Sequence, residues 1–306
     1  MTPARDDVHP APEAAPARAV RPLVREAADR LSAARVDSPE HDARALAVHV
    51  LGLDRPSDLL LVDELADAQA RAYLDLVARR AQRVPLQHLT GRVGFRHIEL
   101  EVGPGVFVPR PETESVVQWA VDALVGVPAP VVADLCTGSG TIAFALANEV
   151  PGVTVHAVEL DPDSLAWTRR NAANRLAAGD PEVHLHLGDA EQALPELDGT
   201  LDLVASNPPY VATHEADLPD PEVVEHDPGV ALWAGEDGLD VVRAVERAAR
   251  RLLKPGGLVV VEHSDRQGET APALFRAAGG WYDVQDHRDL TGRDRFVTAR
   301  WTGSHA

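Results

Sequence analysis

Four consecutive residues, Asn207-Pro208-Pro209-Tyr210, have side chains suited to holding a planar group that carries an NH2. The two prolines stiffen the backbone and cannot donate hydrogen bonds. Rigidity presents the Asn207 side-chain oxygen and the Pro208 carbonyl as fixed acceptors, and two acceptors match the two hydrogens of an NH2 group. Tyr210 offers a flat face for stacking. The segment therefore predicts a site that acts on an NH2 nitrogen attached to a planar carbon.

A glycine-rich loop is the second chemical feature, and it comprises Cys136, Thr137, Gly138, Ser139 and Gly140. The loop follows an apolar strand and opens a helix, so its backbone can approach a ligand closely and the helix start offers unpaired N–H donors. By itself this G-x-G-x-x-A pattern is shared by many nucleotide sites and by simple strand-to-helix turns.

Two carboxylates follow at the ends of later predicted strands. Glu159 lies roughly 20 residues beyond the glycines, where an acid can accept both ribose hydroxyls of an adenosine ligand. Asp161 is a nearby rival for that role. Asp189 is placed to face an adenine amino group, although its Gly-Asp pair is also a turn signal.

The elements that must position these residues alternate between strand and helix. The apolar pattern predicts strands over 131–135, 153–158, 183–187, 201–205 and 258–262, and helices over 163–177 and 239–253. This alternation predicts an α/β fold with a parallel sheet between two layers of helices. Two last strands, 282–285 and 295–301, have no helix between them and are expected to pair as an antiparallel edge. The candidate side chains then meet at the carboxyl ends of the parallel strands.

The chain before the sheet has a different organisation. Residues 1–20 mix charges, proline and alanine, and we expect a disordered tail. Residues 21–84 repeat apolar positions at helical spacing and predict a small helical bundle. Residues 85–105 contain a partly alternating apolar run among glycines and predict a β-hairpin linker. The remainder, 106–306, is the predicted catalytic domain.

Composition narrows the function classes. With 29 Lys and Arg against 48 Asp and Glu, the formal net charge is −19, which disfavours a broad surface for nucleic acid. The single cysteine excludes a multi-cysteine zinc site, and no histidine cluster has metal-ligand spacing, so we expect no metal. No apolar run approaches the length of a membrane span, and the amino terminus lacks a signal-peptide core. We therefore expect a cytoplasmic protein.

Taken together, the glycine loop and Asn-Pro-Pro-Tyr resemble S-adenosylmethionine-dependent methyltransferases of planar NH2 nitrogens. The segment Phe107-Val108-Pro109-Arg110-Pro111-Glu112-Thr113-Glu114 is similar to a signature of the HemK/PrmC family, as are Pro85 to Gly91 and the late Gly292-Arg293-Asp294-Arg295. The resemblance extends over nearly the whole chain after the tail.

The resemblance implies a seven-stranded, Rossmann-like class I methyltransferase domain behind a small helical domain that docks the substrate. The implied reaction methylates the side-chain amide nitrogen (N5) of the glutamine in the Gly-Gly-Gln loop of class-1 peptide chain release factors. The family pattern assigns the loop 136–140, Glu159, Asp189, Ala190 and Asn207 to the cofactor. It assigns Asn207, Pro208, Pro209 and Tyr210 to the glutamine.

Several positions depart from the family pattern. Cys136 stands where glycine is common, and we expect a small buried filler because the reaction needs no covalent intermediate. Ala190 replaces a frequent bulky residue, His88 a common tyrosine, and Ser264 a usual glycine. An N6-adenine methyltransferase of DNA or RNA, a nicotinamide-dependent oxidoreductase and a non-catalytic binding module remain alternatives. We expect a monomer without stable nucleic-acid or membrane binding.

Overall fold

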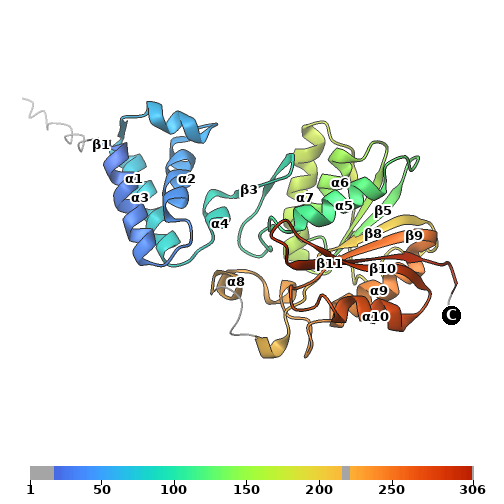
Figure 1. Cartoon of the computed structure of the whole chain (residues 1–306). Helices are drawn as coiled ribbons and strands as arrows, with labels where there is room; N and C mark the ends of the chain where they lie inside the picture. Colours follow the sequence, from blue (N-terminus) through green and yellow to red (C-terminus); the bar gives the residue numbers. More distant parts are fainter. Residues whose placement is uncertain (1–16, 216–220, 305–306) are drawn as a thin grey trace, which may run out of the picture. The chain divides into compact units, whose positions relative to one another are not determined.

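The structure is a computed structural model that describes residues 17–215 and 221–304, and these residues form two compact units that divide between Thr90 and Gly91 (Figure 1). Most of the predicted tail, residues 1–16, lies outside the described residues. The expectation that the tail reaches residue 20 is wrong, because β1 (Arg18–Ala19) pairs with β2 (Glu64–Leu65) and the buried Val20 begins the first helix.

The first unit is the predicted helical bundle. Its helices are α1 (Val20–Ala33), α2 (Pro39–Leu51), α3 (Asp67–Ala81) and the short α4 (Leu86–Thr90), with a 3-10 helix over Pro56–Leu61. Apolar side chains at helical spacing form one core, in which the Tyr73 hydroxyl donates to the Ala43 carbonyl at 3.1 Å. A buried ion pair joins Arg80 of α3 to Asp42 of α2 at 2.7 Å.

The predicted hairpin linker over 85–105 is only partly present. Its first residues form α4 instead, because Pro85 can open a helix and the buried Leu89 packs into the helical core. The hairpin itself comprises β3 (Arg92–Phe95) and β4 (Ile98–Glu101) and belongs to the second unit. Phe95, Ile98 and Leu100 pack into the core of that unit, so the hairpin is part of its fold.

The second unit contains the predicted seven-stranded sheet, in the order β10-β11-β9-β8-β5-β6-β7. The parallel strands are β5 (Val131–Leu135), β6 (Thr154–Glu159), β7 (Val183–Leu187), β8 (Leu201–Ser206) and β9 (Leu253–Glu262). The predicted antiparallel edge is confirmed, since β11 (Asp294–Trp301) pairs with both β9 and β10 (Trp281–Arg288).

Helices cover both faces of this sheet, as Figure 1 shows. On one face lie α5 (Thr113–Ala123), α6 (Thr141–Glu149) and α7 (Pro162–Ala177). On the other lie α9 (Asp240–Leu252) and α10 (Thr270–Ala278), while α8 (Pro221–His226) is a short helix after the Asn-Pro-Pro-Tyr segment. Successive residues of the central strands alternate between the two cores: Val132 and Leu203 face one, and Ala133 and Val204 the other. In residues 17–215 and 221–304, no helix is long and apolar enough to cross a membrane.

Candidate functional site

A cavity of about 600 Å³ lies at the carboxyl ends of β5, β6 and β8, entirely within the second unit. The volume falls in the range of pockets that enclose a ligand of cofactor size. Among the sequence-predicted site residues, those that line the cavity are Cys136, Thr137, Gly138, Ser139, Glu159, Asn207, Pro208, Pro209 and Tyr210. The fold therefore brings the glycine loop and the Asn-Pro-Pro-Tyr segment to one site.

Asp134, at the end of β5, organises the glycine loop. Its Oδ2 accepts hydrogen bonds from the Thr137 hydroxyl at 2.5 Å and from the Ala143 N–H at 3.0 Å. Only 1% of the residue is exposed, and burial raises the pKa of the carboxyl from 3.8 to about 7. Asp134 also lines the cavity, and its Oδ1 has no hydrogen-bond partner among the described residues. The unpaired oxygen is itself buried, so an ammonium group in the cavity would have to displace neighbouring loop atoms to reach it, and it would then supply the missing donor and hold the carboxylate ionised.

Two glycines shape the loop in different ways. Gly140 has φ +91° and precedes α6, and a Cβ added there would lie 2.0 Å from the Phe144 ring, so only glycine fits. Gly138 has φ +58°, and a Cβ there would meet no atom within 4 Å. Its N–H donates to Glu159 at 2.8 Å. The loop thus leaves room beside Gly138 where it borders the cavity.

Glu159 is held at the end of β6 by backbone donors. Gly138 N–H donates to Oε2, and Asp161 N–H donates to Oε1 at 2.9 Å. The side chain is buried, and this burial raises the pKa of its carboxyl. Each oxygen can accept a further hydrogen bond, so the carboxylate can bind vicinal hydroxyls. Asp161, the rival considered above, instead caps α7 through Asp163 and Ser164.

S-adenosylmethionine fits this set of groups. Its ammonium group could bond to Asp134, and its ribose hydroxyls could bond to Glu159. Its methionine chain could occupy the free space beside Gly138. All these cofactor assignments stay predictions, and three of the expected residues lie outside the cavity lining. Asp189 is exposed and accepts from the Glu191 N–H at 2.8 Å, and neither it nor Ala190 is among the residues that line the cavity. Gly140 also lies outside the cavity lining, and its contribution is to the conformation of the glycine-rich loop.

Cys136 differs from the expected buried filler. Its side chain is half-buried and lines the cavity, and its φ is +62°. That left-handed backbone conformation explains why glycine suits the position, since it costs glycine nothing. Burial and neighbouring carboxylates raise the pKa of the thiol, so the sulfur stays protonated and unreactive.

The Asn-Pro-Pro-Tyr segment follows β8, and side-chain hydrogen bonds connect it to α5 and to the end of β9. Asn207 Nδ2 donates to the Thr113 hydroxyl oxygen at 3.2 Å, and the Tyr210 hydroxyl donates to Glu262 Oε1 at 3.4 Å. Burial raises the pKa of the Tyr210 hydroxyl, which therefore keeps its proton. At the end of β9, burial raises the pKa of the Glu262 carboxyl to about 7, while the charge of Arg295 lowers it.

Sequence reasoning did not assign roles to several residues that form the site. Thr113 and Phe107 appear in the sequence analysis only as parts of a signature, and Asp134 only as a residue of the predicted strand 131–135. Glu262 was noticed only as the end of a predicted strand. The position of two of these residues in the sequence could have indicated a role in the site. Asp134 and Glu262 are acids within or at the end of predicted parallel strands, and Glu159 directly follows such a strand.

The part of the chain that the structure describes holds no group of three or more His, Cys, Asp or Glu side chains arranged to bind a metal ion. His156, His184 and His186 do gather on one face of β6 and β7, with His156 Nδ1 3.1 Å from His186 Nε2. Burial lowers the pKa of His156 to about 4.

Comparisons with known proteins show the family to which this chain is related. Two family models match the chain, the PrmC N-terminal domain over residues 22–91 and a methyltransferase domain over residues 128–287. A release factor glutamine methyltransferase of Streptomyces coelicolor is 54% identical over 279 residues, covering 90% of this chain and 96% of that protein. Its namesake in Mycolicibacterium smegmatis is 46% identical over 280 residues, covering 92% and 97%.

A solved structure, a release factor-specific protein-(glutamine-N5) methyltransferase from Alicyclobacillus acidocaldarius, is 27% identical. It covers 66% of this chain and 98% of its own, with a TM-score of 0.39.

Proposed function

This chain belongs to the family of release factor glutamine methyltransferases, and from that premise we propose that its cavity methylates the N5 amide nitrogen of the glutamine in the Gly-Gly-Gln loop of class-1 release factors. The methyl donor is S-adenosylmethionine. One observation carries the proposal: Asp134, Glu159 and Asn207 come from adjacent parallel strands and line the same cavity. The groups that we propose to bind the cofactor and the amide therefore line one cavity.

The residues of the chain act by holding and orienting the substrate amide. An amide nitrogen is a poor nucleophile because its lone pair is delocalised into the carbonyl. When bound, S-adenosylmethionine supplies an electrophilic methyl group on a sulfonium. The Asn207 side-chain oxygen and the Pro208 carbonyl accept the two amide hydrogens, and these fixed dipoles favour charge on the nitrogen. Orientation supplies the rest. Transfer would break the bond between methyl and sulfur and leave a neutral thioether, and the methylated nitrogen becomes acidic and loses one proton to solvent, so no strong base is required.

The Asn207→Ala variant tests this assignment. It should lower kcat by about 100-fold or more, on the scale of removing one preorganised polar partner. Affinity for S-adenosylmethionine, measured by calorimetry, should change little because Asp134 and Glu159 remain. Asn148→Ala is the matched control, since Asn148 is exposed on α6 and bonds to Asp180 at 2.9 Å outside the cavity. Wild-type kcat in the Asn207 variant would refute the proposed role.

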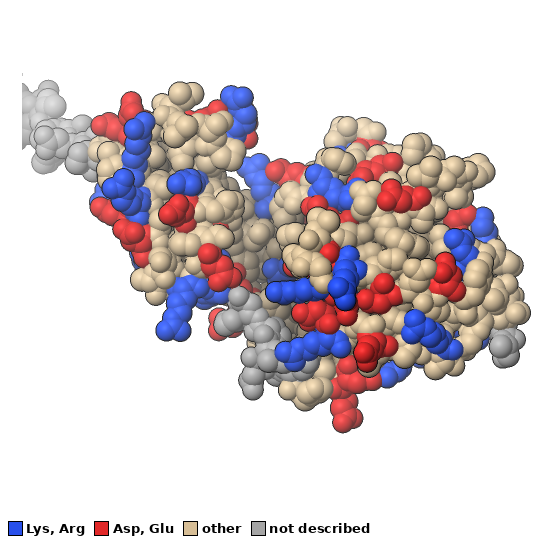
Figure 2. Space-filling model, viewed as in Figure 1, with Lys and Arg blue, Asp and Glu red and all other residues tan. Residues whose placement is uncertain are grey.

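The adenine alternative has less support. Relatives that cover 90% or more of this chain are named release factor glutamine methyltransferases. The net charge of −19 opposes phosphate binding, and Figure 2 shows acidic and basic side chains interspersed on the visible face. A protein loop needs no wide basic surface, whereas a nucleic acid does.

The first unit is proposed to dock the release factor. Leu60 and Leu61 of its 3-10 helix are 70% and 84% exposed, which is unusual for adjacent leucines and suits a protein contact. Because the proposed substrate acts in translation termination, we also propose that the enzyme works in the cytoplasm. A monomer without stable nucleic-acid binding is sufficient for this reaction.

A further inference from the structure

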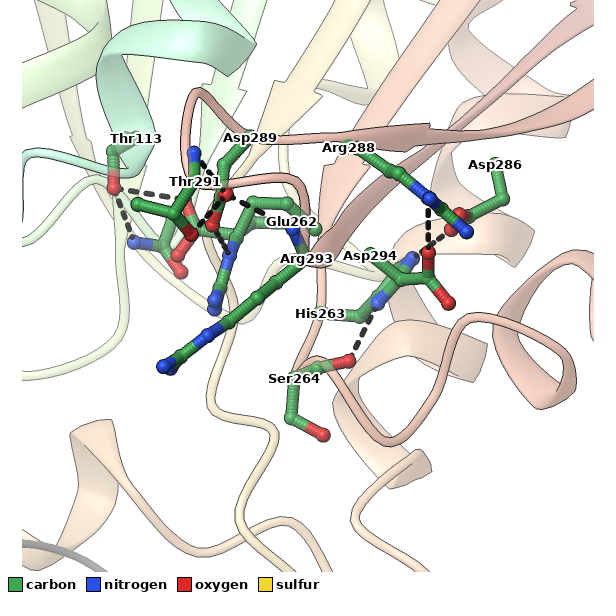
Figure 3. A network of polar contacts seen from close by, with 12 residues as sticks. Thr113, Glu262, His263, Ser264, Asp286, Arg288, Asp289, Thr291, Arg293 and Asp294 are labelled. Atoms are coloured by element: carbon green, nitrogen blue, oxygen red, sulfur yellow. Dashed lines mark hydrogen bonds and ion pairs between the residues drawn. The ribbon is translucent and has the colours of Figure 1, made fainter.

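Three side chains from distant parts of the sequence form a continuous hydrogen-bonded chain behind the proposed amide site. Asn207 Nδ2 bonds to Thr113 Oγ1 at 3.2 Å, and Thr113 Oγ1 bonds to Glu262 Oε2 at 2.7 Å. Thr113 is 2% exposed and Glu262 1% exposed, so water does not compete for these contacts. Figure 3 shows Thr113 and Glu262 pointing toward each other from α5 and the end of β9.

The direction of each hydrogen bond follows from the donor inventory. An ionised carboxylate only accepts, so the single hydroxyl hydrogen of Thr113 must point to Glu262. Thr113 Oγ1 can then only accept from its other neighbour. Asn207 must therefore turn its NH2 group toward Thr113 and its oxygen away from it. A side-chain amide without such a partner can rotate by half a turn and exchange its donor and acceptor ends.

Glu262 is itself fixed by donors on both oxygens. Thr113 donates to Oε2, and the Tyr210 hydroxyl donates to Oε1 at 3.4 Å. Both ends of the Asn-Pro-Pro-Tyr segment are thus connected to one buried carboxylate by hydrogen bonds. Tyr210 bonds to Glu262 directly, and Asn207 is connected to it through Thr113. Burial raises the pKa of this carboxyl to about 7, and the hydrogen bond from Thr113 and the charge of Arg295 oppose that rise, so Glu262 is ionised above about pH 7.

We propose that Thr113 and Glu262 are positioning residues that lock the Asn207 amide with its oxygen as the group presented to the substrate. The lock makes the site an acceptor for NH2 hydrogens and disfavours substrates that offer only an acceptor, such as a carboxylate in place of the amide. This inference rests on the proposed function, because it assumes that Asn207 receives the substrate amide.

Thr113→Val and Thr113→Ser form the first test. Valine keeps the shape but removes both hydrogen bonds, whereas serine keeps the hydroxyl. At pH 8.5, where Glu262 is ionised, valine should lower kcat by about 10-fold and serine by less than about 2-fold. The affinity for S-adenosylmethionine should stay at the wild-type value in both. Thr298→Val is the matched control, because Thr298 is also buried and bonds to His287 at 2.8 Å outside the cavity.

Glu262→Gln tests the direction of the chain rather than its presence. The glutamine NH2 can donate to Thr113, which then donates to the Asn207 oxygen and turns the amide around. The variant keeps every contact and removes a buried charge, so at pH 8.5 its melting temperature should equal or exceed the wild-type value while kcat falls by about 10-fold. A merely structural role would lower the melting temperature and leave kcat of the folded enzyme unchanged.

The kcat values of these variants distinguish a failure of the positioning role of Thr113 and Glu262 from a failure of the proposed function. A normal kcat in Thr113→Val, or an equal loss in Thr113→Ser, would overturn the lock. A loss confined to cofactor affinity would overturn it as well. Asn207→Ala, assayed alongside, reports on the proposed function: if it loses activity while Thr113→Val does not, only the lock fails. If Asn207→Ala keeps full activity, the proposed function of the segment fails first.

Discussion

Replacing Asp134 by asparagine should weaken cofactor binding and stabilise the cofactor-free protein. Asparagine keeps an oxygen that can accept the bonds from Thr137 and Ala143, but it removes the buried charge. Burial raises the pKa of Asp134 to about 7, so the folded state holds this proton more tightly than the unfolded state does. The stability of the cofactor-free wild type therefore falls as the pH rises from 3.8 toward 7 and then levels off.

The magnitude follows from the two pKa values, 3.8 and about 7. At 1.36 kcal/mol for each tenfold change in proton affinity, the buried charge costs about 4 kcal/mol above pH 7. Roughly half of this, about 2 kcal/mol, develops between pH 5.5 and pH 8. For a domain of this size, 2 kcal/mol corresponds to about 4–8 °C in melting temperature.

The assay compares melting temperatures of wild type and Asp134→Asn without cofactor at pH 5.5 and pH 8. The variant should gain about 4–8 °C relative to wild type over this interval. At pH 8, calorimetry should show S-adenosylmethionine binding weakened by about 30-fold, the cost of losing a hydrogen bond to a charged group. Asp122→Asn is the control, because Asp122 is exposed on α5. Parallel melting curves, or unchanged cofactor affinity, would refute the reasoning.

Four further changes have expected outcomes. Gly140→Ala should destabilise the protein by about 3 kcal/mol in denaturant titrations, because its new Cβ meets a ring. Gly138→Ala should cost only about 1 kcal/mol, but it should weaken cofactor binding. His156→Phe should reduce the loss of melting temperature as the pH falls from 6.5 toward 4, because a histidine with a lowered folded pKa stabilises only when neutral. The double change Leu60→Ser and Leu61→Ser should raise KM for a full-length release factor about 10-fold and spare a short Gly-Gly-Gln peptide.

Each of these has a contrary result. Equal destabilisation by the two glycine variants would mean that a clash with the Phe144 ring does not determine the cost of a side chain at Gly140. A pH profile of melting unchanged by His156→Phe would remove the histidine cluster as a source of acid sensitivity. Val125→Ser, at a residue 77% exposed in the second unit, controls for the leucines. An equal rise of KM in that control would contradict specific docking.

Periodicity predicted the sheet well because its central parallel strands, such as β5 and β8, are buried on both faces and are mostly apolar, whereas the largely unburied β7 alternates apolar residues with histidine. The predicted strands 131–135 and 183–187 match β5 and β7, and the antiparallel edge follows from the absence of a helix between the last two strands. The start of β9 at Leu253 was missed, because Pro255 and two glycines read as a turn. The helix over Leu86–Thr90 was missed because the adjacent glycines suggested a hairpin.

The site was predictable where its residues end strands, and unpredictable where it depends on contacts between distant segments. Glu159 and Asn207 line the cavity as the alternation of elements implies. The bond between Thr113 and Glu262 joins residues 149 positions apart, and no local pattern encodes it. The left-handed backbone conformation of Cys136 could not be predicted from its residue type, because cysteine rarely adopts a positive φ.

The most direct measurement is a methyl-transfer assay with labelled S-adenosylmethionine and two purified release factors, one intact and one with alanine in place of the Gly-Gly-Gln glutamine. The account predicts that label enters the intact factor, at that glutamine, and that the alanine factor stays unlabelled. Equal label in both factors, or none in either while the cofactor is bound, would contradict the claim that this cavity methylates the glutamine amide.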